Sequence, residues 1–258
     1  MLKIFNILFK YRFLLHELVV RDIKVRYKRS VLGLVWTILN PLLMMCIITA
    51  VFSNVFRMNI ENYAVYLLIG QVVFNLNAEA TIQAQMSIFG NSSLIKKVYI
   101  PKYLFPLSKV LSALVNFFFA FFALLLVMLI TNSEFYVSIF LSIVPLIYLL
   151  MFSLGIGLIL SAITVYFMDI CHLYTVFITA WTYLTPIFYP IDILPYNIRW
   201  VVKLNPMYHF IDYFRNLIMY GKIPGINENL ICLGIGLLFL SIGVIVFRKL
   251  QNNFILHI

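Results

Sequence analysis

Six hydrophobic stretches, each close to the length needed to cross a lipid bilayer, take up most of this 258-residue chain. Inside a bilayer no water is available to the backbone, so a crossing segment must form a helix or join a closed barrel. About 20 apolar residues suffice for one helical crossing. We therefore expect an all-α integral membrane protein with six transmembrane helices, at about 31–56, 63–84, 104–130, 137–167, 172–189 and 228–247.

The composition leaves little material for a water-soluble domain. Hydrophobic residues make up 64% of the chain and charged residues 11%, whereas soluble domains have about 45–50% and about 25%. The connections between the hydrophobic stretches are mostly short. The chain is therefore expected to work among membrane lipids, and the question of function turns towards passage across the membrane.

A basic segment precedes the hydrophobic stretches. Residues 1–30 contain eight lysines and arginines. Apolar residues recur in this segment at steps of three or four: Ile4, Leu8, Tyr11, Leu15 and Leu18. This pattern predicts an amphipathic helix lying along the membrane surface, and its apolar runs are too short for a signal peptide. We expect a cytoplasmic amphipathic interface helix at 1–30 and a six-span domain at 31–258.

The distribution of positive charge predicts the orientation of the spans. Of the 19 lysines and arginines, 14 lie in the amino-terminal segment, in the region 85–110 and in the tail. Positively charged residues remain on the cytoplasmic side, so we expect both termini to be cytoplasmic. The net charge of +10 then reflects membrane topology, and we expect no nucleic-acid partner.

A row of polar residues runs along the second hydrophobic stretch. Gln71, Asn75, Glu79 and Gln83 follow one another at four-residue steps, which places them on one face of a helix. Polar groups in hydrocarbon are costly unless they meet a partner or water. The row could line a pathway, or it could form hydrogen bonds to neighbouring helices. Glu79 has no evident basic partner in the sequence.

The fourth hydrophobic stretch contains a row of small residues, Ser153, Gly157 and Ser161. Small residues at this spacing allow the backbone of another helix to approach closely. We interpret this row as a helix-packing surface.

The connection between the second and third stretches predicts a short helix at about 91–100. Ser92 or Ser93 could cap the helix, and Pro101 would end it. This helix would combine apolar and basic side chains: Leu94, Ile95, Lys96, Lys97, Val98 and Tyr99. The segment could be a solvated interfacial loop, or a docking helix for a cytoplasmic partner.

Prolines interrupt the segment between the fifth and sixth stretches, and aromatic residues are frequent in it. A broken helix at membrane depth needs protein or a water-filled cavity around it. The aromatic residues could form a belt at the headgroup level. We favour re-entrant hairpins at about 190–222 that close a pathway on the outer side, with Tyr189, Tyr196 and Trp200 as the rings that narrow it or contact sugar.

The sequence contains no recognisable catalytic motif. The four histidines form no metal-ligand spacing, and the chain has no paired-carboxylate motif and no HExxH. It also lacks the GxxxxGK[ST] phosphate-binding loop, so it cannot hold ATP by that motif. We expect neither enzymatic activity nor a bound metal or cofactor.

Several motifs resemble those of a known family of transporters. Residues 21–36 read RDIKVRYKRSVLGLVW and are followed by Asn40 and Pro41, which resembles the opening signature of type-2 ABC exporter permeases. The subgroup that it resembles most exports O-antigen, capsule or teichoic acid. Later motifs agree with it, YPIDILP at 189–195, LNPMY at 204–208 and YFR at 213–215, so the resemblance extends over the whole chain in order and spacing.

The resemblance implies a half-transporter in the bacterial inner membrane. Two copies of this chain would form a homodimer around a central pathway. Two copies of a separate ABC ATPase subunit would bind below and would hold ATP and Mg. The substrate would be a polymer linked to polyprenyl diphosphate, whose charge basic residues at the cytoplasmic side could attract.

The resemblance also suggests functional segments. It equates about 10–30 with the family's interface helix, about 91–100 with its coupling helix and about 190–222 with its outer gate hairpins. The expected ATPase contacts are Arg21, Asp22, Arg26, Tyr27, Leu94, Ile95, Lys96, Val98 and Tyr99. The expected pathway or gate residues are Gln71, Asn75, Glu79, Tyr189, Tyr196 and Trp200. Asp22 and Arg26, four residues apart, are expected to pair on one helix face.

Other classes of protein remain open at this point. The chain could be a type-2 ABC exporter of another substrate, such as a drug or a lipid. A secondary transporter would need an ionisable pair within the membrane. A membrane enzyme acting on lipid-linked sugars would need clustered acids, and the nine acidic residues are scattered. The remaining alternative is a scaffold subunit.

Overall fold

The computed structural model describes residues 9–28, 30, 32–33, 35–55, 60 and 62–257, without the side chains of 27 and 52–55, and in this part of the chain the regular elements are all helical. The longer helices are α2 (Arg12–Tyr27), α3 (Val35–Val55), α4 (Tyr63–Gln85), α6 (Leu104–Ile130), α7 (Ile143–Thr164), α8 (Ile170–Leu184), α10 (Pro206–Ile218) and α11 (Ile226–Leu250). The shorter ones are η1 (Phe89–Asn91), α5 (Ser92–Lys97), η2 (Val137–Ser142), η3 (Ile191–Ile193), α9 (Tyr196–Lys203), η4 (Gln251–Asn253) and α12 (Phe254–His257).

The hydrophobic helices confirm an all-helical integral membrane protein. Among the described residues, four helical segments are long and apolar enough to cross a membrane: Tyr63–Gln85, Leu104–Ile130, Val137–Thr164 and Ile226–His257. Of two shorter apolar helices, Val35–Val51 falls within the predicted first span, and Ile170–Leu184 overlaps the predicted fifth span but begins two residues before it. Each predicted stretch therefore contains an apolar helix, and the number of six crossings stays a prediction.

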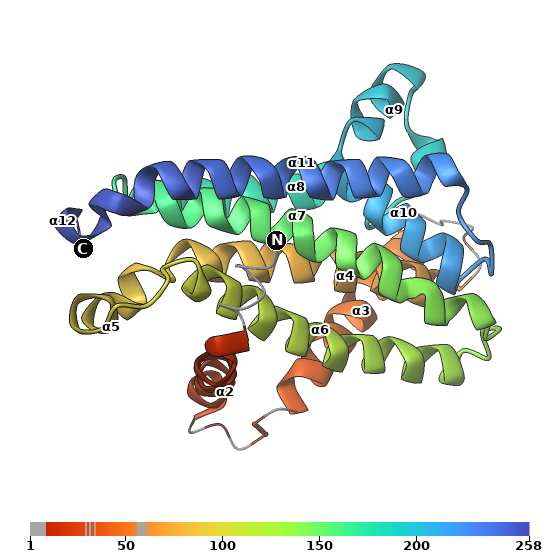
Figure 1. Ribbon diagram of the computed structural model, residues 1–258. Helices are drawn as coiled ribbons and strands as arrows, with labels where there is room; N and C mark the ends of the chain where they lie inside the picture. Colours follow the sequence, from red (N-terminus) through yellow and green to blue (C-terminus); the bar gives the residue numbers. More distant parts are fainter. Residues whose placement is uncertain are drawn as a thin grey trace.

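Long helices packed side by side make up the body of the protein (Figure 1), and small residues set their spacing. Helices α7 and α11 lie against each other at Gly155 and Gly243, where a Cβ on either glycine would overlap the facing backbone. Along the predicted small-residue row of α7, Ser153 donates a hydrogen bond to Asn77 of α4 at 3.0 Å. A Cβ on Gly157 would approach the Ala84 side chain of α4 to 2.8 Å. The prediction of a helix-packing surface is confirmed.

The predicted fifth span is wrong at its carboxyl end. We expected a helix to 189, but α8 ends at Leu184. Pro186 disfavours helical backbone at the residue before it, and Thr185 is extended, with ψ 134°. The chain therefore leaves the helix before the aromatic residues that follow.

Side chains from α4 and α10 satisfy the backbone of this non-helical stretch. Arg215 donates to the carbonyl oxygens of Pro186 at 2.9 Å and Ile187 at 3.0 Å. The Tyr63 and Tyr66 hydroxyls donate to the carbonyl oxygens of Phe188 at 2.8 Å and Tyr189 at 3.0 Å. Four consecutive carbonyl groups thus have donors in the described part of the chain, as irregular backbone within a membrane requires.

Arg215 is itself enclosed by the helices that it connects. Its side chain is buried, and it also donates to the carbonyl oxygen of Tyr66 at 3.3 Å. The guanidinium lies 3.4 Å from the centroid of the Tyr66 ring, a cation–π contact. Gly70 leaves room for it, because a Cβ there would come within 2.9 Å of the guanidinium.

The segment 190–222 is not one continuous helix, as its prolines predicted. Helices α9 and α10 divide it, and Asn205 marks the boundary, since its side chain accepts from the backbone N–H of Met207 at 3.0 Å. Asn205 thereby caps α10, with Pro206 in the first turn where its missing N–H costs nothing. Helix α10 packs into the core against α4, while α9 projects from the body of the protein (Figure 1).

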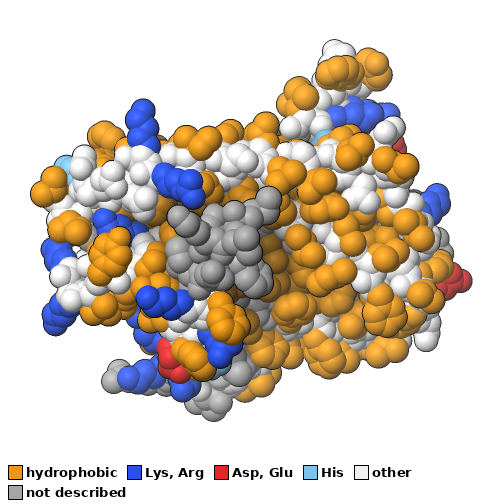
Figure 2. Space-filling view, in the orientation of Figure 1, with side chains coloured by type: hydrophobic (Ala, Val, Ile, Leu, Met, Phe, Trp, Pro, Cys, Tyr) orange, Lys and Arg blue, Asp and Glu red, His pale blue; other side chains and the backbone are white. Residues whose placement is uncertain are grey.

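The connections divide between the two ends of the bundle (Figure 1). Helix α5 and the carboxyl terminus lie at one end, and the turn after α6 and the loop after α10 lie at the other. Most of the Lys and Arg side chains visible in Figure 2 gather at the end with α5 and α12, while hydrophobic side chains cover much of the rest of this face.

Replacing Arg215 with Met should destabilise the protein, because buried backbone carbonyls would lose their donor. Each buried acceptor left without a partner costs about 1–3 kcal/mol, and we expect a loss of about 2–4 kcal/mol in the free energy of unfolding. Thermal unfolding in detergent measures this loss. Lys203→Met, which changes an exposed side chain of α9, is the control. An unchanged melting temperature for Arg215→Met would refute the assigned role.

Candidate functional site

A cavity of about 790 Å³ lies among α3, α4, α6 and α8, and we call it the polar cavity after the polar side chains on part of its mostly apolar wall. The polar side chains that line it come from elements far apart in the sequence: Arg26, Thr37, Asn40, Gln71, Asn75, Glu79, Asn116 and Thr182. Apolar and aromatic side chains, among them Trp36, Met44 and Phe117, complete the wall. The cavity combines polar groups with an aromatic surface, which suits a ligand with both hydroxyl groups and apolar faces.

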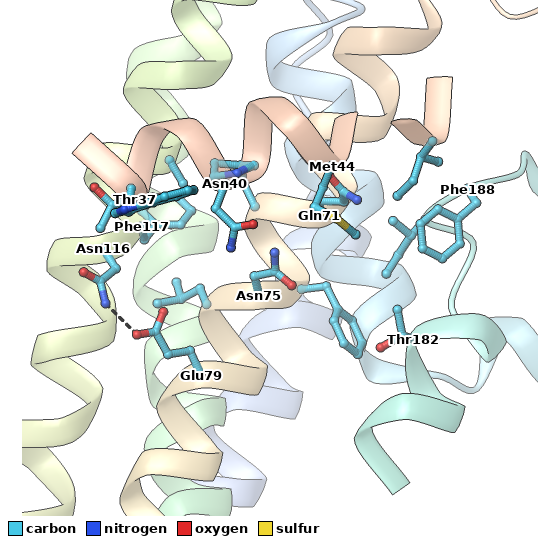
Figure 3. Close-up of a pocket in the computed structure, with 18 of the residues that line it drawn as sticks. Thr37, Asn40, Met44, Gln71, Asn75, Glu79, Asn116, Phe117, Thr182 and Phe188 are labelled. Atoms are coloured by element: carbon cyan, nitrogen blue, oxygen red, sulfur yellow. Dashed lines mark hydrogen bonds between the residues drawn. The ribbon is translucent and has the colours of Figure 1, made fainter. Parts of the chain in front are cut away.

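The predicted polar face of α4 contributes one side of this cavity. Gln71, Asn75 and Glu79 are lining residues, and Figure 3 shows them together with Asn40 and Asn116 around the same space. Gln83 continues the row and donates a hydrogen bond to Glu79 at 2.7 Å. The hydrogen bonds that Glu79 accepts from Arg26 of α2 and Asn116 of α6 bear out the alternative of bonding to neighbouring helices. The face also lines a cavity, and its role in a pathway stays a prediction.

Donors from three helices converge on the carboxylate of Glu79. In the described part of the chain, its Oε1 atom accepts from Asn116 of α6 at 2.5 Å, from Gln83 of α4 at 2.7 Å and from the Arg26 guanidinium of α2. The expectation that Glu79 lacks a basic partner is wrong. No spacing rule connects positions 26 and 79, because the partner comes from α2 and folding alone brings the two together.

Two amide oxygens on the cavity wall are buried and have no hydrogen-bond partner within the described residues. They are Oε1 of Gln71 and Oδ1 of Asn116, and the exposed fractions of these residues are 9% and 8%. A buried acceptor without a donor is unfavourable. Both atoms are therefore suited to accept hydrogen bonds from a molecule in the cavity.

Asp22 and Arg26 do not pair with each other, which corrects the sequence prediction. Asp22 accepts from the Lys109 ammonium of α6 at 2.7 Å and from Arg21 at 3.3 Å, and Arg26 pairs with Glu79. An exposed pair on one helix contributes only about 0.3–0.5 kcal/mol. Lys109 of α6 and Glu79 of α4 are partly buried and offer Asp22 and Arg26 partners of opposite charge. These two ion pairs hold α2 against the bundle.

A second contact joins α2 to the predicted docking segment. Arg21 donates to the Asn91 side-chain oxygen at 3.0 Å, and the Asn91 amide donates to the Ser87 carbonyl at 2.7 Å. The basic and acidic residues of α2 thus contact the segment before α5, the start of α6 and the cavity. The side chain of Tyr27, another predicted contact, lies outside the described residues.

The docking helix is shorter than predicted. Helix α5 spans Ser92–Lys97, not 91–100, and Asn91 takes the N-cap position in place of Ser92 or Ser93. It ends before Val98, which is extended with φ −133° and ψ 135°, so Pro101 plays no part in ending it.

The predicted ATPase contacts of this segment divide between the protein interior and its surface. Ile95 is buried in a cluster with Leu15 and Leu18 of α2, and Leu94 is partly buried there. Lys96, Lys97 and Val98 are exposed, and Tyr99 is 96% exposed. The exposed group is available to a partner, whereas Ile95 attaches α5 to its own chain.

Lys102 faces the carboxyl terminus instead of solvent. Its ammonium donates to the carbonyl oxygen of Gln251 at 2.6 Å and lies 5.5 Å from the centroid of the Phe254 ring. Burial lowers the pKa of Lys102 below its usual value. The connection before α6 and the tail after α11 are thereby joined at the basic end of the bundle.

The three predicted gate rings do not line the polar cavity. Tyr196 and Trp200 lie on α9 and are 76% and 63% exposed. Tyr189 donates to the Tyr183 carbonyl at 2.8 Å and lines a separate, mostly apolar cavity of about 570 Å³ beside α7, α8 and α9. The described residues include no group of three or more His, Cys, Asp or Glu side chains that could hold a metal ion.

Sequence reasoning missed several residues of the polar cavity. Asn40 and Asn116 lie within the first and third hydrophobic stretches, and Thr37 and Thr182 lie in the first and fifth. An isolated amide within an apolar stretch is the signal that could have identified Asn40 and Asn116, because such a group needs a partner or water.

Comparisons with known proteins agree with these observations. Residues 14–219 match the sequence family described as ABC-2 type transporter. The chain is 30% identical to an O-antigen export system permease protein, RfbA, of Klebsiella pneumoniae, over 91% of this chain and 90% of that protein. It is 28% identical to RfbA of Myxococcus xanthus, over 98% of both chains. It is 22% identical to the polysialic acid transport protein KpsM of Escherichia coli, over 91% of this chain and 92% of that protein.

Reversing one charge of the Asp22–Lys109 pair should loosen α2, and reversing both should restore it. Asp22→Lys or Lys109→Asp places like charges together, so amide hydrogen exchange of α2 should accelerate in nanodiscs. The double variant should recover protection, with a coupling energy of roughly 0.5–3 kcal/mol. Strictly additive effects would show that the pair does not attach α2 to α6.

Proposed function

The chain belongs to the ABC-2 type transporter family, and from that premise we propose that it is the transmembrane subunit of an ATP-driven exporter. Its substrate is a lipid-linked cell-surface polysaccharide, which it moves outward across the bacterial inner membrane. Relatives that match over most of their length are named O-antigen export permeases, which supports this choice over a drug or simple lipid. The chain supplies the membrane passage and is not an enzyme.

The polar cavity beside α4 is the observation that carries the proposal. An apolar helical bundle has no structural need for a cavity that brings together Asn40, Gln71, Asn75 and Asn116. Amide side chains form hydrogen bonds to hydroxyl groups in either direction, and aromatic rings on the same wall can stack on sugar rings. A pathway for a glycan needs these two kinds of surface.

The active assembly contains two copies of this chain and two copies of a separate ABC ATPase subunit, which binds ATP and Mg. The homodimer encloses the pathway, with the polar face of α4 turned towards it. The exposed residues at 96–99 and the helix α2 face the ATPase. Contacts of α2 with Asn91, Lys109 and Glu79 support a role in conveying movement of the ATPase to the cavity.

The membrane arrangement has six crossings and cytoplasmic termini. The location of α5 and the carboxyl terminus at one end of the bundle, with basic side chains around them (Figure 2), supports this orientation. Helices α9 and α10 then lie on the outer side and form the gate segment at about 190–222. Arg215 and the two tyrosines of α4 attach this segment to the pathway wall.

A secondary transporter would need an ionisable pair within the membrane, and the Arg26–Glu79 ion pair is the candidate for that role. The two mechanisms differ in their source of energy. An exporter of this family needs its ATPase subunit, whereas a secondary transporter needs an ion gradient and works alone.

The proposed function is tested with the complex of this chain and its ATPase subunit, purified together in nanodiscs. Undecaprenyl-diphosphate-linked glycans should stimulate ATP hydrolysis several-fold, and undecaprenyl phosphate without glycan should stimulate it less. Stimulation by drugs or unmodified lipids, but by no lipid-linked glycan, would point to another ABC substrate. Ion-driven transport by this chain alone would contradict the ABC mechanism.

The predicted orientation can be checked with single cysteines in a background without native cysteines. Asn59, a natural choice for an outer loop, lies outside the described residues, and Asn91 is buried. Glu134, in the connection after α6, and Tyr99, two residues after α5, are exposed, and these two connections lie at opposite ends of the bundle (Figure 1). In spheroplasts, an impermeant maleimide should label Glu134→Cys and should leave Tyr99→Cys unlabelled until the membrane is opened. The reverse pattern would overturn the topology.

The exposed end of the docking segment should be required for ATPase binding. Val98→Asp combined with Tyr99→Asp replaces the two apolar side chains of the exposed group with acidic ones. Both side chains are already exposed, so folding should be preserved. Copurification of the ATPase subunit should fall at least tenfold. Ile223→Asp, at an exposed position in the loop after α10, is the control. Normal copurification and export in the double variant would show that docking occurs elsewhere.

A further inference from the structure

The carboxylate of Glu79 occupies a set of donors that would suit a larger anion. Asn116, Gln83 and Arg26 approach one oxygen of this carboxylate from three helices. Amide donors combined with a guanidinium are a common arrangement for binding phosphate oxygens. Glu79 thus takes the position of an anionic ligand within the described cavity.

A diphosphate could compete with this carboxylate. The Arg26 and Glu79 side chains are 37% and 26% exposed. Both line the cavity, so a ligand can reach them. Two linked phosphate groups carry more negative charge than one carboxylate and offer more acceptor oxygens. Away from bulk water this difference in charge has a larger effect on the interaction energy.

The rest of the cavity wall is suited to the sugar next to the diphosphate. Gln71 lies eight residues before Glu79 on α4, about 12 Å along the helix axis at 1.5 Å per residue. Its buried side-chain oxygen has no donor among the described residues, and Asn75 lies between the two positions. This unpaired acceptor is independent of the Glu79 cluster, and it points to a ligand rich in hydroxyl groups.

Helix α2 can release Glu79 without leaving the bundle. Asp22, one turn before Arg26, is attached to Lys109 of α6 at 2.7 Å, and Arg21 contacts Asn91 at 3.0 Å. These contacts do not depend on Glu79. The end of α2 that carries Arg26 can therefore change its partner while the rest of the helix stays in place.

From this geometry we propose that Glu79 is an internal substitute for the substrate's diphosphate. In the empty transporter Glu79 occupies the donors Arg26, Gln83 and Asn116. The diphosphate of the polyprenyl-linked polysaccharide displaces it and takes these donors, while the first sugars contact Gln71 and Asn75. This inference rests on the proposed function and specifies which part of the substrate each group recognises.

The proposal is tested by the affinity of the nanodisc complex for fluorescent polyprenyl diphosphate. Arg26→Gln should weaken binding at least tenfold, because a charged donor is lost. Glu79→Gln should strengthen binding about threefold or more, because the competing charge is removed. If the ion pair only maintains the structure, breaking it from either side should weaken binding in the same way. Opposite directions therefore support the proposal, and equal directions or no change would overturn it.

Three control measurements establish whether the site recognises the diphosphate in particular. Arg248→Gln neutralises an exposed arginine of α11, and it should leave affinity unchanged. Millimolar inorganic pyrophosphate should compete with the lipid, most weakly in Arg26→Gln and most strongly in Glu79→Gln. This result would support recognition of the diphosphate itself. If phosphatidylglycerol reproduces that order, the site binds anionic lipid in general and the proposal fails. If the wild-type complex does not bind polyprenyl diphosphate, the proposed function fails as well.

Discussion

The non-helical stretch after α8 depends on hydrogen bonds from Arg215 and the tyrosines of α4. This stretch contains four carbonyl groups that have no helical hydrogen bond and lie within an apolar bundle. Each of them would be costly without a donor. Because the described part of α4 and α10 supplies these donors, the chain can turn into α9 and then return along the core as α10. The position of the proposed gate segment is thus a consequence of one buried arginine and its neighbours.

The need of buried polar groups for hydrogen-bond partners also determines how the walls of the cavity can bind a ligand. Around Glu79 the charges and amides pair across α2, α4 and α6, whereas the oxygens of Gln71 and Asn116 remain without donors in the described structure. Some polar groups of the wall therefore bond to one another, and others remain available to a ligand. Since α2 also contacts the segment before α5, a movement at that end of the bundle can reach the cavity through one helix.

Much of the fold follows from hydrophobicity, because lipid leaves helices as almost the only solution for these stretches. Proline geometry signals the break at Pro186, although the predicted fifth span ran past it, and the polar face of α4 was predictable from its four-residue spacing. Three features were not. The Arg26–Glu79 and Asp22–Lys109 pairs join residues whose separation in sequence carries no periodic signal. Helix α5 is short because Val98 is extended, and no glycine or adjacent proline in the sequence signals this. The outward placement of Tyr196 and Trp200 depends on how α9 leaves the bundle.

The most direct test of the proposed pathway is photo-crosslinking during export. A photoreactive amino acid at Asn75, on the cavity wall, should form an adduct with lipid-linked polysaccharide when the complex hydrolyses ATP. The same amino acid at Leu238, exposed on α11, should give none. Active export with no adduct at position 75, or with adducts at position 238 instead, would contradict the claim that the polysaccharide passes along the polar face of α4.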